Sequence, residues 1–208
     1  MPGRGLVVSL KRRSIPVSVG NKAMNLHHLL GHKRVIPETF VCTWQAYERY
    51  RGNDLSLVED LKSELAPVIH PGKSYAIRSS ANVEDSLDRS FAGQFKSLLN
   101  INSVDDVIMA IWSVWSSTDT STVQAYQQAR KTPEDQLKMA VIIQEMVPAV
   151  YSGVALSKNP VSGADEIIVE AVKGEGEQLV QGGVTPLRWV NKWGSWLEKP
   201  EEDQFPPS

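Results

Sequence analysis

The 208-residue sequence predicts an α+β fold, because helical and strand patterns occupy different parts of the chain. In the first part, apolar side chains recur at helical spacing, for example at Ala23, Leu26, Leu29 and Leu30. The last third instead holds short β-branched runs separated by Gly, Pro, Asn and Ser, which are typical of an antiparallel or mixed sheet. Between these parts, an apolar run ends in a single cation, Arg78.

The helical segments have recognisable boundaries. The segment that begins at Val19 is expected to end at Gly31, because Gly commonly follows the last turn of a helix. Thr43 is a suitable N-cap for residues 44–50, and Gly52 ends that helix. Further helices are expected at residues 55–65, at residues 104–115 behind the cap Ser103, and at residues 123–130.

The strands and the change in composition suggest how the chain is organised. Strands are expected at Val7–Leu10, Thr39–Cys42, Tyr75–Ile77, Met139–Ile143, Gly153–Leu156 and Ile167–Val172. We predict an N-terminal lobe with the phosphate-binding elements at residues 1–135 and a strand-rich second lobe at residues 136–192. Residues 193–208 are rich in Glu, Asp and Pro, and we interpret them as a tail or linker.

Composition argues against several classes of function. With 22 basic and 24 acidic residues the net charge is −2, so no strong field attracts nucleic acid or a membrane. The single cysteine, Cys42, cannot form an intramolecular disulfide. No apolar window approaches the roughly 18 residues of a membrane span, and the N-terminus lacks a signal-peptide pattern. We therefore expect a cytoplasmic protein that binds neither nucleic acid nor membranes.

The segment around Arg78 carries the main chemical signal. The arginine enters a loop rich in Ser, Asn and Asp, which ends in the small-residue turn Phe91–Gln94. A cation at a strand end, facing a glycine turn with free backbone N–H groups, suits a polyphosphate. This pattern predicts a nucleotide-binding domain. The alternative is a structural salt bridge from Arg78 to Glu84 or Asp85.

Several motifs follow one another along the chain. They are Gly20-Asn21-Lys22, Ile36–Val41, Arg78–Ala81 with Glu84-Asp85, Ser90–Gln94, Gln144–Val147, Ser152–Val154 with Asn159-Pro160, Glu170-Ala171 with Gly176-Glu177, Leu179–Gly182 and Thr185-Pro186. In this order they resemble the N-terminal nucleotide-binding region of the phosphoenolpyruvate synthase and pyruvate phosphate dikinase family, which also includes rifampicin phosphotransferases. The resemblance extends from about residue 19 to about residue 190.

The resemblance implies an ATP-grasp-like fold, in which two α+β lobes clamp ATP, and which is incomplete here at the C-terminus. It also implies the ATP-binding domain of a dikinase-type phosphotransferase that is similar to phosphoenolpyruvate synthase. Such a domain splits ATP and passes a phosphoryl group to a histidine on a separate domain. The enzyme class implied is a phosphotransferase with paired acceptors, similar to a pyruvate, water dikinase. Whether the acceptor is pyruvate, an antibiotic hydroxyl, a glucan or another group is expected to be decided by domains elsewhere.

The resemblance also implies a set of nucleotide-binding residues, which are Lys22, Arg78, Gly93, Gln94, Ser97, Gln144, Glu145, Met146, Val147 and Glu170. Lys22 and Arg78 are the implied catalytic cations, because phosphoryl transfer depends on positioning and charge neutralisation. The loop from Gly93 to Ser97 would cover the phosphates with backbone donors and a hydroxyl. Gln144 would face the adenine or ribose, and the backbone of Glu145–Val147 would read the adenine edge.

Each of these residues also has a structural interpretation. Lys22 at the start of a helix can be an ordinary surface lysine, and Gln144 can simply point to solvent. Glu170 follows an apolar run, so its carboxylate is either paired in the interior or reaches a ligand. Two departures concern the loops, since Leu187 stands where relatives commonly have Asp and Glu175 where they commonly have Leu.

The magnesium carboxylate of the family and a following Gln-x-Arg lie beyond Thr185-Pro186, and no later residue resembles them. We therefore assign no metal ligand within this chain, expect Mg²⁺ to be held from outside it, and expect slow or absent transfer by this chain alone. The four histidines do not match a carrier site, so the phosphohistidine carrier and the acceptor-binding domain are expected elsewhere. The alternative function is a non-catalytic interaction module that retains a degenerate scaffold.

Overall fold

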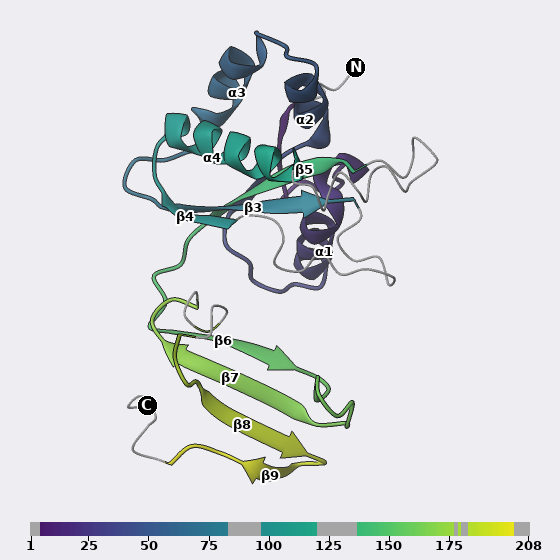
Figure 1. The fold of residues 1–208 in the computed structure, drawn as a ribbon, viewed down its shortest axis with the longest axis vertical. Coiled ribbons are helices and arrows are strands. Elements are labelled where there is room, and N and C mark those ends of the chain that lie inside the picture. The colour runs from purple at the N-terminus through teal and green to yellow at the C-terminus, as the bar shows by residue number, and fades with distance from the viewer. Residues whose placement is uncertain (1–4, 83–96, 120–136, 177–178, 180–182, 202–208) are drawn as a thin grey trace. The chain divides into compact units, whose positions relative to one another are not determined.

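The computed structural model describes residues 5–82, 97–119, 137–176, 179 and 183–201. It is a mixed α/β structure that divides into two units, Met1–Met146 and Val147–Ser208. Figure 1 shows the ribbon of both units. The predicted helix at residues 123–130 and the Phe91–Gln94 turn lie outside the described residues.

The first unit is built on a five-stranded antiparallel sheet. The strands, in their order across the sheet, are β1 (Val7–Ser9), β2 (Thr39–Cys42), β5 (Met139–Glu145), β3 (Tyr75–Ala81) and β4 (Ser97–Ile101). Three helices lie on one face, namely α2 (Trp44–Arg51), α3 (Leu57–Leu65) and α4 (Val104–Ser116). Helix α1 (Gly20–Gly31) packs on the other face, after a short 3₁₀ turn at Val17–Val19 (Figure 1). A second 3₁₀ turn, Ser117–Asp119, follows α4.

Two cores form because strand β5 is apolar on both sides. Residues Met139–Ile143 are all buried, and in a strand successive side chains point to opposite faces. Val141 and Ile143 join the larger core with α2, α3 and α4. Ala140 and Ile142 join the smaller core, in which Ala23 of α1 takes part. The sheet is therefore held from both sides through its central strand.

The observed helix caps agree only partly with those predicted from the sequence. Ser103 precedes α4, and its hydroxyl accepts the N–H of Asp106 at 3.1 Å, as expected of an N-cap. Thr43 holds the N-cap position of α2, but its side chain makes no capping hydrogen bond. Helix α1 ends at Gly31 as predicted, although the residue with positive φ is Lys33.

The second unit is a four-stranded antiparallel sheet. Its strands follow one another in chain order: β6 (Tyr151–Leu156), β7 (Ile167–Lys173), β8 (Leu187–Lys192) and β9 (Ser195–Glu198). Ile168, Val172 and Val190 are its buried apolar side chains among the described residues.

The unit boundaries differ from the predicted lobes at residues 1–135, 136–192 and 193–208. The first unit extends to Met146, because β5 pairs with β2 and β3 instead of with the later strands. The predicted tail is also partly ordered, because Ser195–Glu198 pairs with β8. Among the described residues, no helix has both the length and the apolar composition needed to cross a membrane.

An exposed charge network joins α2 to the start of α3. The guanidinium of Arg49 donates from Nε to Asp54 at 2.6 Å and from Nη2 to Asp60 at 2.6 Å. The hydrogen bond from Arg49, together with those from Ser56, lowers the pKa of Asp54 to about 2. Because the pKa is depressed in the folded state, this interaction stabilises the fold above the ordinary pKa and is lost as pH falls towards 2.

We predict that Leu61→Ala will lower the free energy of unfolding of the first unit by about 2–5 kcal/mol, because the side chain is fully buried and its removal leaves a cavity. Urea denaturation followed by circular dichroism measures the change. Leu55→Ala is the matched control, since Leu55 is 94% exposed. Equal losses for the two variants would contradict the assigned core.

We also predict that Asp54→Asn will reduce the acid sensitivity of the first unit. Wild-type protein should lose more stability between pH 4 and pH 2 than the variant, because only the wild type protonates a group whose pKa is held at about 2. Urea midpoints measured at both pH values provide the comparison. Identical shifts in the two proteins would show that Asp54 does not contribute.

Candidate functional site

Arg78 is the exposed residue in a strand that is otherwise buried. The side chains of β3 on either side of it, from Tyr75 to Ile77 and from Ser79 to Ala81, are covered. Since side chains alternate along a strand, Arg78 shares a face of the sheet with Ser80, whose hydroxyl contacts α1. The arginine thus lies on the face that carries α1. The alternative partners Glu84 and Asp85 lie outside the described residues.

The structure brings Lys22 to the same strand. Lys22 is half-buried in the first turn of α1, and its Nζ donates to Oγ of Ser79 in a long contact of 3.5 Å. Ser79 directly follows Arg78 in the chain. Lys22 therefore contacts the residue next to Arg78, although side chains alternate along a strand and Ser79 projects from the other face of the sheet.

A hydroxyl lies next to this pair. Ser97 is the exposed first residue of β4, and it is directly opposite Arg78 in the antiparallel register. Paired residues of neighbouring strands project from the same face, so the hydroxyl and the guanidinium share one side of the sheet. The other predicted members of this loop, Gly93 and Gln94, lie outside the described residues.

Gln144 is held within the sheet and does not simply point to solvent. It is half-buried on β5, opposite Ala76 of β3 and Thr39 of β2, which places it on the Arg78 face. Its Nε2 donates to Oγ1 of Thr39 at 3.0 Å. The amide is thereby oriented by a buried threonine that the motif analysis did not single out.

The backbone of Glu145–Val147 is partly engaged already. The N–H of Glu145 donates to the carbonyl of Glu38, and the N–H of Met146 donates to the carbonyl of Ser74, each at 2.8 Å. An adenine-reading role for this segment therefore depends on its carbonyl groups and on the N–H of Val147. Val147 is 60% exposed.

Lys73, which the sequence analysis missed, holds the Glu145 side chain in place. The ammonium of Lys73 forms a 2.8 Å ion pair with Glu145, and the hydrogen bond to this carboxylate raises the pKa of Lys73. The sequence signal that could have revealed Lys73 is its position just before β3, the strand that carries Arg78.

Glu170 belongs to the second unit, where it is already paired. Its Oε1 lies 3.2 Å from Nε of Arg188 on the neighbouring strand β8, and Arg188 also contacts Glu198 at 2.7 Å. The side chain of Glu170 is 31% exposed, so this is a surface pair and not an interior one.

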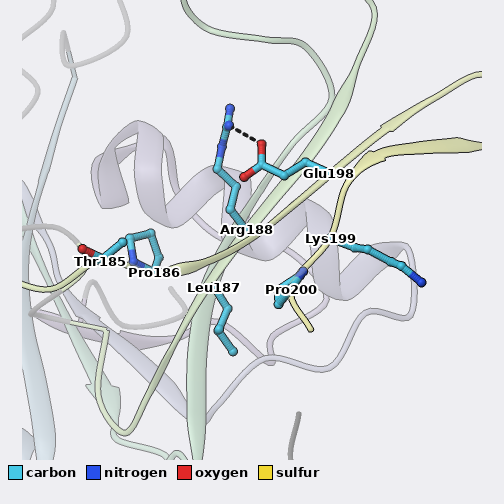
Figure 2. Close-up of a pocket in the computed structure, with 7 residues that line it drawn as sticks. All are labelled: Thr185, Pro186, Leu187, Arg188, Glu198, Lys199 and Pro200. Carbon is cyan, nitrogen blue, oxygen red and sulfur yellow. Dashed lines mark hydrogen bonds and ion pairs between the residues drawn. The ribbon is translucent and has the colours of Figure 1, made fainter. Parts of the chain in front are cut away.

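Arg188 and Glu198 also line a pocket of about 430 Å³ in the second unit. Figure 2 shows the two side chains pointing towards one another. The remaining lining residues are Thr185, Pro186, Leu187, Lys199 and Pro200. The Thr185-Pro186 motif and its neighbour Leu187 had been noted in the sequence. In the part of the chain that the structure describes, no three His, Cys, Asp or Glu side chains cluster as metal ligands.

Comparison with known proteins places the chain in a family. Residues 55–193 match the pyruvate phosphate dikinase AMP/ATP-binding domain. Phosphoenolpyruvate synthase of Aeropyrum pernix is 39% identical over 116 residues, which are 55% of this chain and 14% of that protein. The uncharacterized phosphotransferase YvkC of Bacillus subtilis is 30% identical over 201 residues, which cover 86% of this chain and 24% of that protein.

A third relative is the prodigiosin synthesizing transferase PigC of Serratia marcescens, which is 32% identical over 194 residues. That alignment covers 82% of this chain and 22% of the relative, so the chain spans less than a quarter of all three proteins. The family match covers well over half of the 208 residues. The chain therefore belongs to the pyruvate phosphate dikinase AMP/ATP-binding domain family, as the order of its motifs had predicted.

Proposed function

We propose that this chain binds ATP as the nucleotide-binding domain of a phosphotransferase similar to phosphoenolpyruvate synthase, with an ATP-grasp arrangement. The triphosphate binds on the α1 face of the first unit, where Lys22 and Arg78 neutralise its charge. The observation that carries this proposal is the contact of Lys22 with Ser79, the residue next to Arg78. The family of the chain and its phosphoenolpyruvate synthase relatives support the same choice of ligand.

The two cations serve different purposes. A guanidinium presents several N–H donors in a planar fork and can bind two phosphate oxygens at once, whereas an ammonium acts as a compact point charge. Arg78 therefore orients the phosphates from strand β3, and Lys22 adds positive charge from helix α1. The hydroxyl of Ser97, opposite Arg78 in the sheet, supplies one further donor. Gly93 and Gln94 remain predicted backbone donors.

The adenine is proposed to lie beyond the end of β5. Gln144 faces the base or the ribose with its orientation fixed by Thr39. Because the N–H groups of Glu145 and Met146 already bond within the unit, the base is read by carbonyl oxygens and by the N–H of Val147. Glu170 stays a predicted nucleotide-binding residue. Its carboxylate is paired with Arg188.

In the proposed reaction, a histidine nitrogen of a separate carrier domain forms a bond to a phosphorus of ATP while the bond from that phosphorus to a bridging oxygen breaks, and the remaining nucleotide leaves with that oxygen. The phosphohistidine then passes the phosphoryl group to an acceptor such as pyruvate, and Mg²⁺, when bound, would neutralise phosphate charge. Residues of this chain bind and orient the phosphates, because such transfer is catalysed mainly by positioning and charge neutralisation. The metal ligands, the carrier histidine and the acceptor site are proposed to lie outside this chain.

The test is equilibrium binding of ATP to the 208-residue chain, with and without Mg²⁺. We predict that Arg78→Ala raises the Kd for ATP by about ten- to a hundred-fold, the range for loss of a charged hydrogen bond. Arg78→Lys should fall between wild type and Arg78→Ala, because it keeps the charge and loses the fork. The measurement is isothermal titration calorimetry.

The matched control is Arg34→Ala, which removes an exposed arginine of equal charge that follows α1. Its Kd should equal that of the wild type. An Arg78→Ala protein that binds ATP as tightly as the wild type would refute the proposed phosphate site. No binding to the wild type at millimolar ATP would favour the non-catalytic interaction module instead.

A further inference from the structure

Helix α1 touches strand β3 through a glycine that no other residue can replace. Gly20 has φ 77° and ψ 171°, a combination that is essentially restricted to glycine. A Cβ atom at this position would lie 2.0 Å from the carbonyl oxygen of Ser80 and 2.7 Å from its hydroxyl oxygen. The backbone at the start of α1 therefore lies directly against the backbone of β3.

The hydroxyl of Ser80 accepts a hydrogen bond from the backbone of α1. Helix α1 begins at Gly20, and Val19 in the N-cap position offers no side-chain hydrogen bond to the first turn. The N–H of Ala23 donates to Oγ of Ser80 at 3.1 Å. The first turn of α1 is thereby held by a side chain of β3.

A third contact fixes the end of the strand. Nδ2 of Asn21 donates to the carbonyl of Asn82 at 3.2 Å. Asn82 in turn accepts the N–H of Lys138 through Oδ1 at 2.9 Å, and its own N–H donates to the carbonyl of Lys138 at 3.2 Å. The first turn of α1 is thus joined to β3 and to the residue before β5 by directed hydrogen bonds.

These contacts surround Lys22, which lies between Asn21 and Ala23. We infer that Gly20 and Ser80 are positioning residues, which set the first turn of α1 so that the ammonium of Lys22 reaches the phosphate-binding end of β3. The inference rests on the proposed function. It explains why Ser80 is completely buried although it carries a hydroxyl, since that hydroxyl holds the helix that carries the lysine.

The test uses Ser80→Ala in the full chain and measures the Kd for ATP with Mg²⁺ present. We predict an increase of roughly five-fold, the fold-change that corresponds to one neutral hydrogen bond. The control is Ser103→Ala, which removes a cap of the same 3.1 Å length from α4 on the opposite face. Ser103→Ala should lower thermal stability and leave the Kd unchanged.

A double-mutant cycle with Lys22→Met separates positioning from general damage. If Ser80 acts through Lys22, Ser80→Ala has no further effect on the Kd once the ammonium is gone. An equal loss in both backgrounds, or a wild-type Kd for Ser80→Ala, would overturn the inference. If Ser80→Ala does not fold, Ser80→Cys gives the same comparison, because it replaces the hydroxyl with a somewhat larger thiol that is a much weaker acceptor.

The outcomes also distinguish this inference from the proposed function. Loss of binding by Lys22→Met and Arg78→Ala, with no effect of Ser80→Ala, would reject the positioning role and leave the phosphate site standing. Unchanged binding by both Lys22→Met and Arg78→Ala would reject the phosphate site itself, and the positioning role with it.

Discussion

The unequal covering of the two faces of the first sheet determines where polar chemistry can be placed. Five strands about 4.8 Å apart span roughly 19 Å, whereas one helix is about 10 Å across. Three helices cover one face, and α1 is the one described helix on the other. A single helix covers only part of that face, so Arg78 and Ser97 can remain exposed beside a packed core.

The sequence predicted what depends on local patterns or on motif order. Periodicity located α3 and α4, and β-branched runs located most of the strands, because both signals reside in neighbouring residues. It could not assign β5 to the first sheet, since pairing with β2 and β3 joins distant segments. The hydrogen bond from α1 to Ser80 and the pairing of Glu170 with Arg188 were missed for the same reason.

The error at the C-terminal boundary has a different origin, because a local signal was present. Trp193 and Gly194, at φ 50° and φ 84°, form the two-residue connection between β8 and β9. A residue followed by Gly between two strands is the usual signature of a tight hairpin. The acidic and proline-rich composition of the tail outweighed that signature, and Ser195–Glu198 was therefore interpreted as a linker.

Bringing Lys22 and Arg78 to one strand also has an energetic consequence for the fold. Both cations belong to the folded first unit, Lys22 on α1 and Arg78 on β3. A ligand that binds only the folded state stabilises it, by about 2.7 kcal/mol at a hundred times its Kd. In the proposed site, the contacts that hold α1 against β3 also hold Lys22 in place, so nucleotide affinity and the stability of the first unit depend on the same contacts.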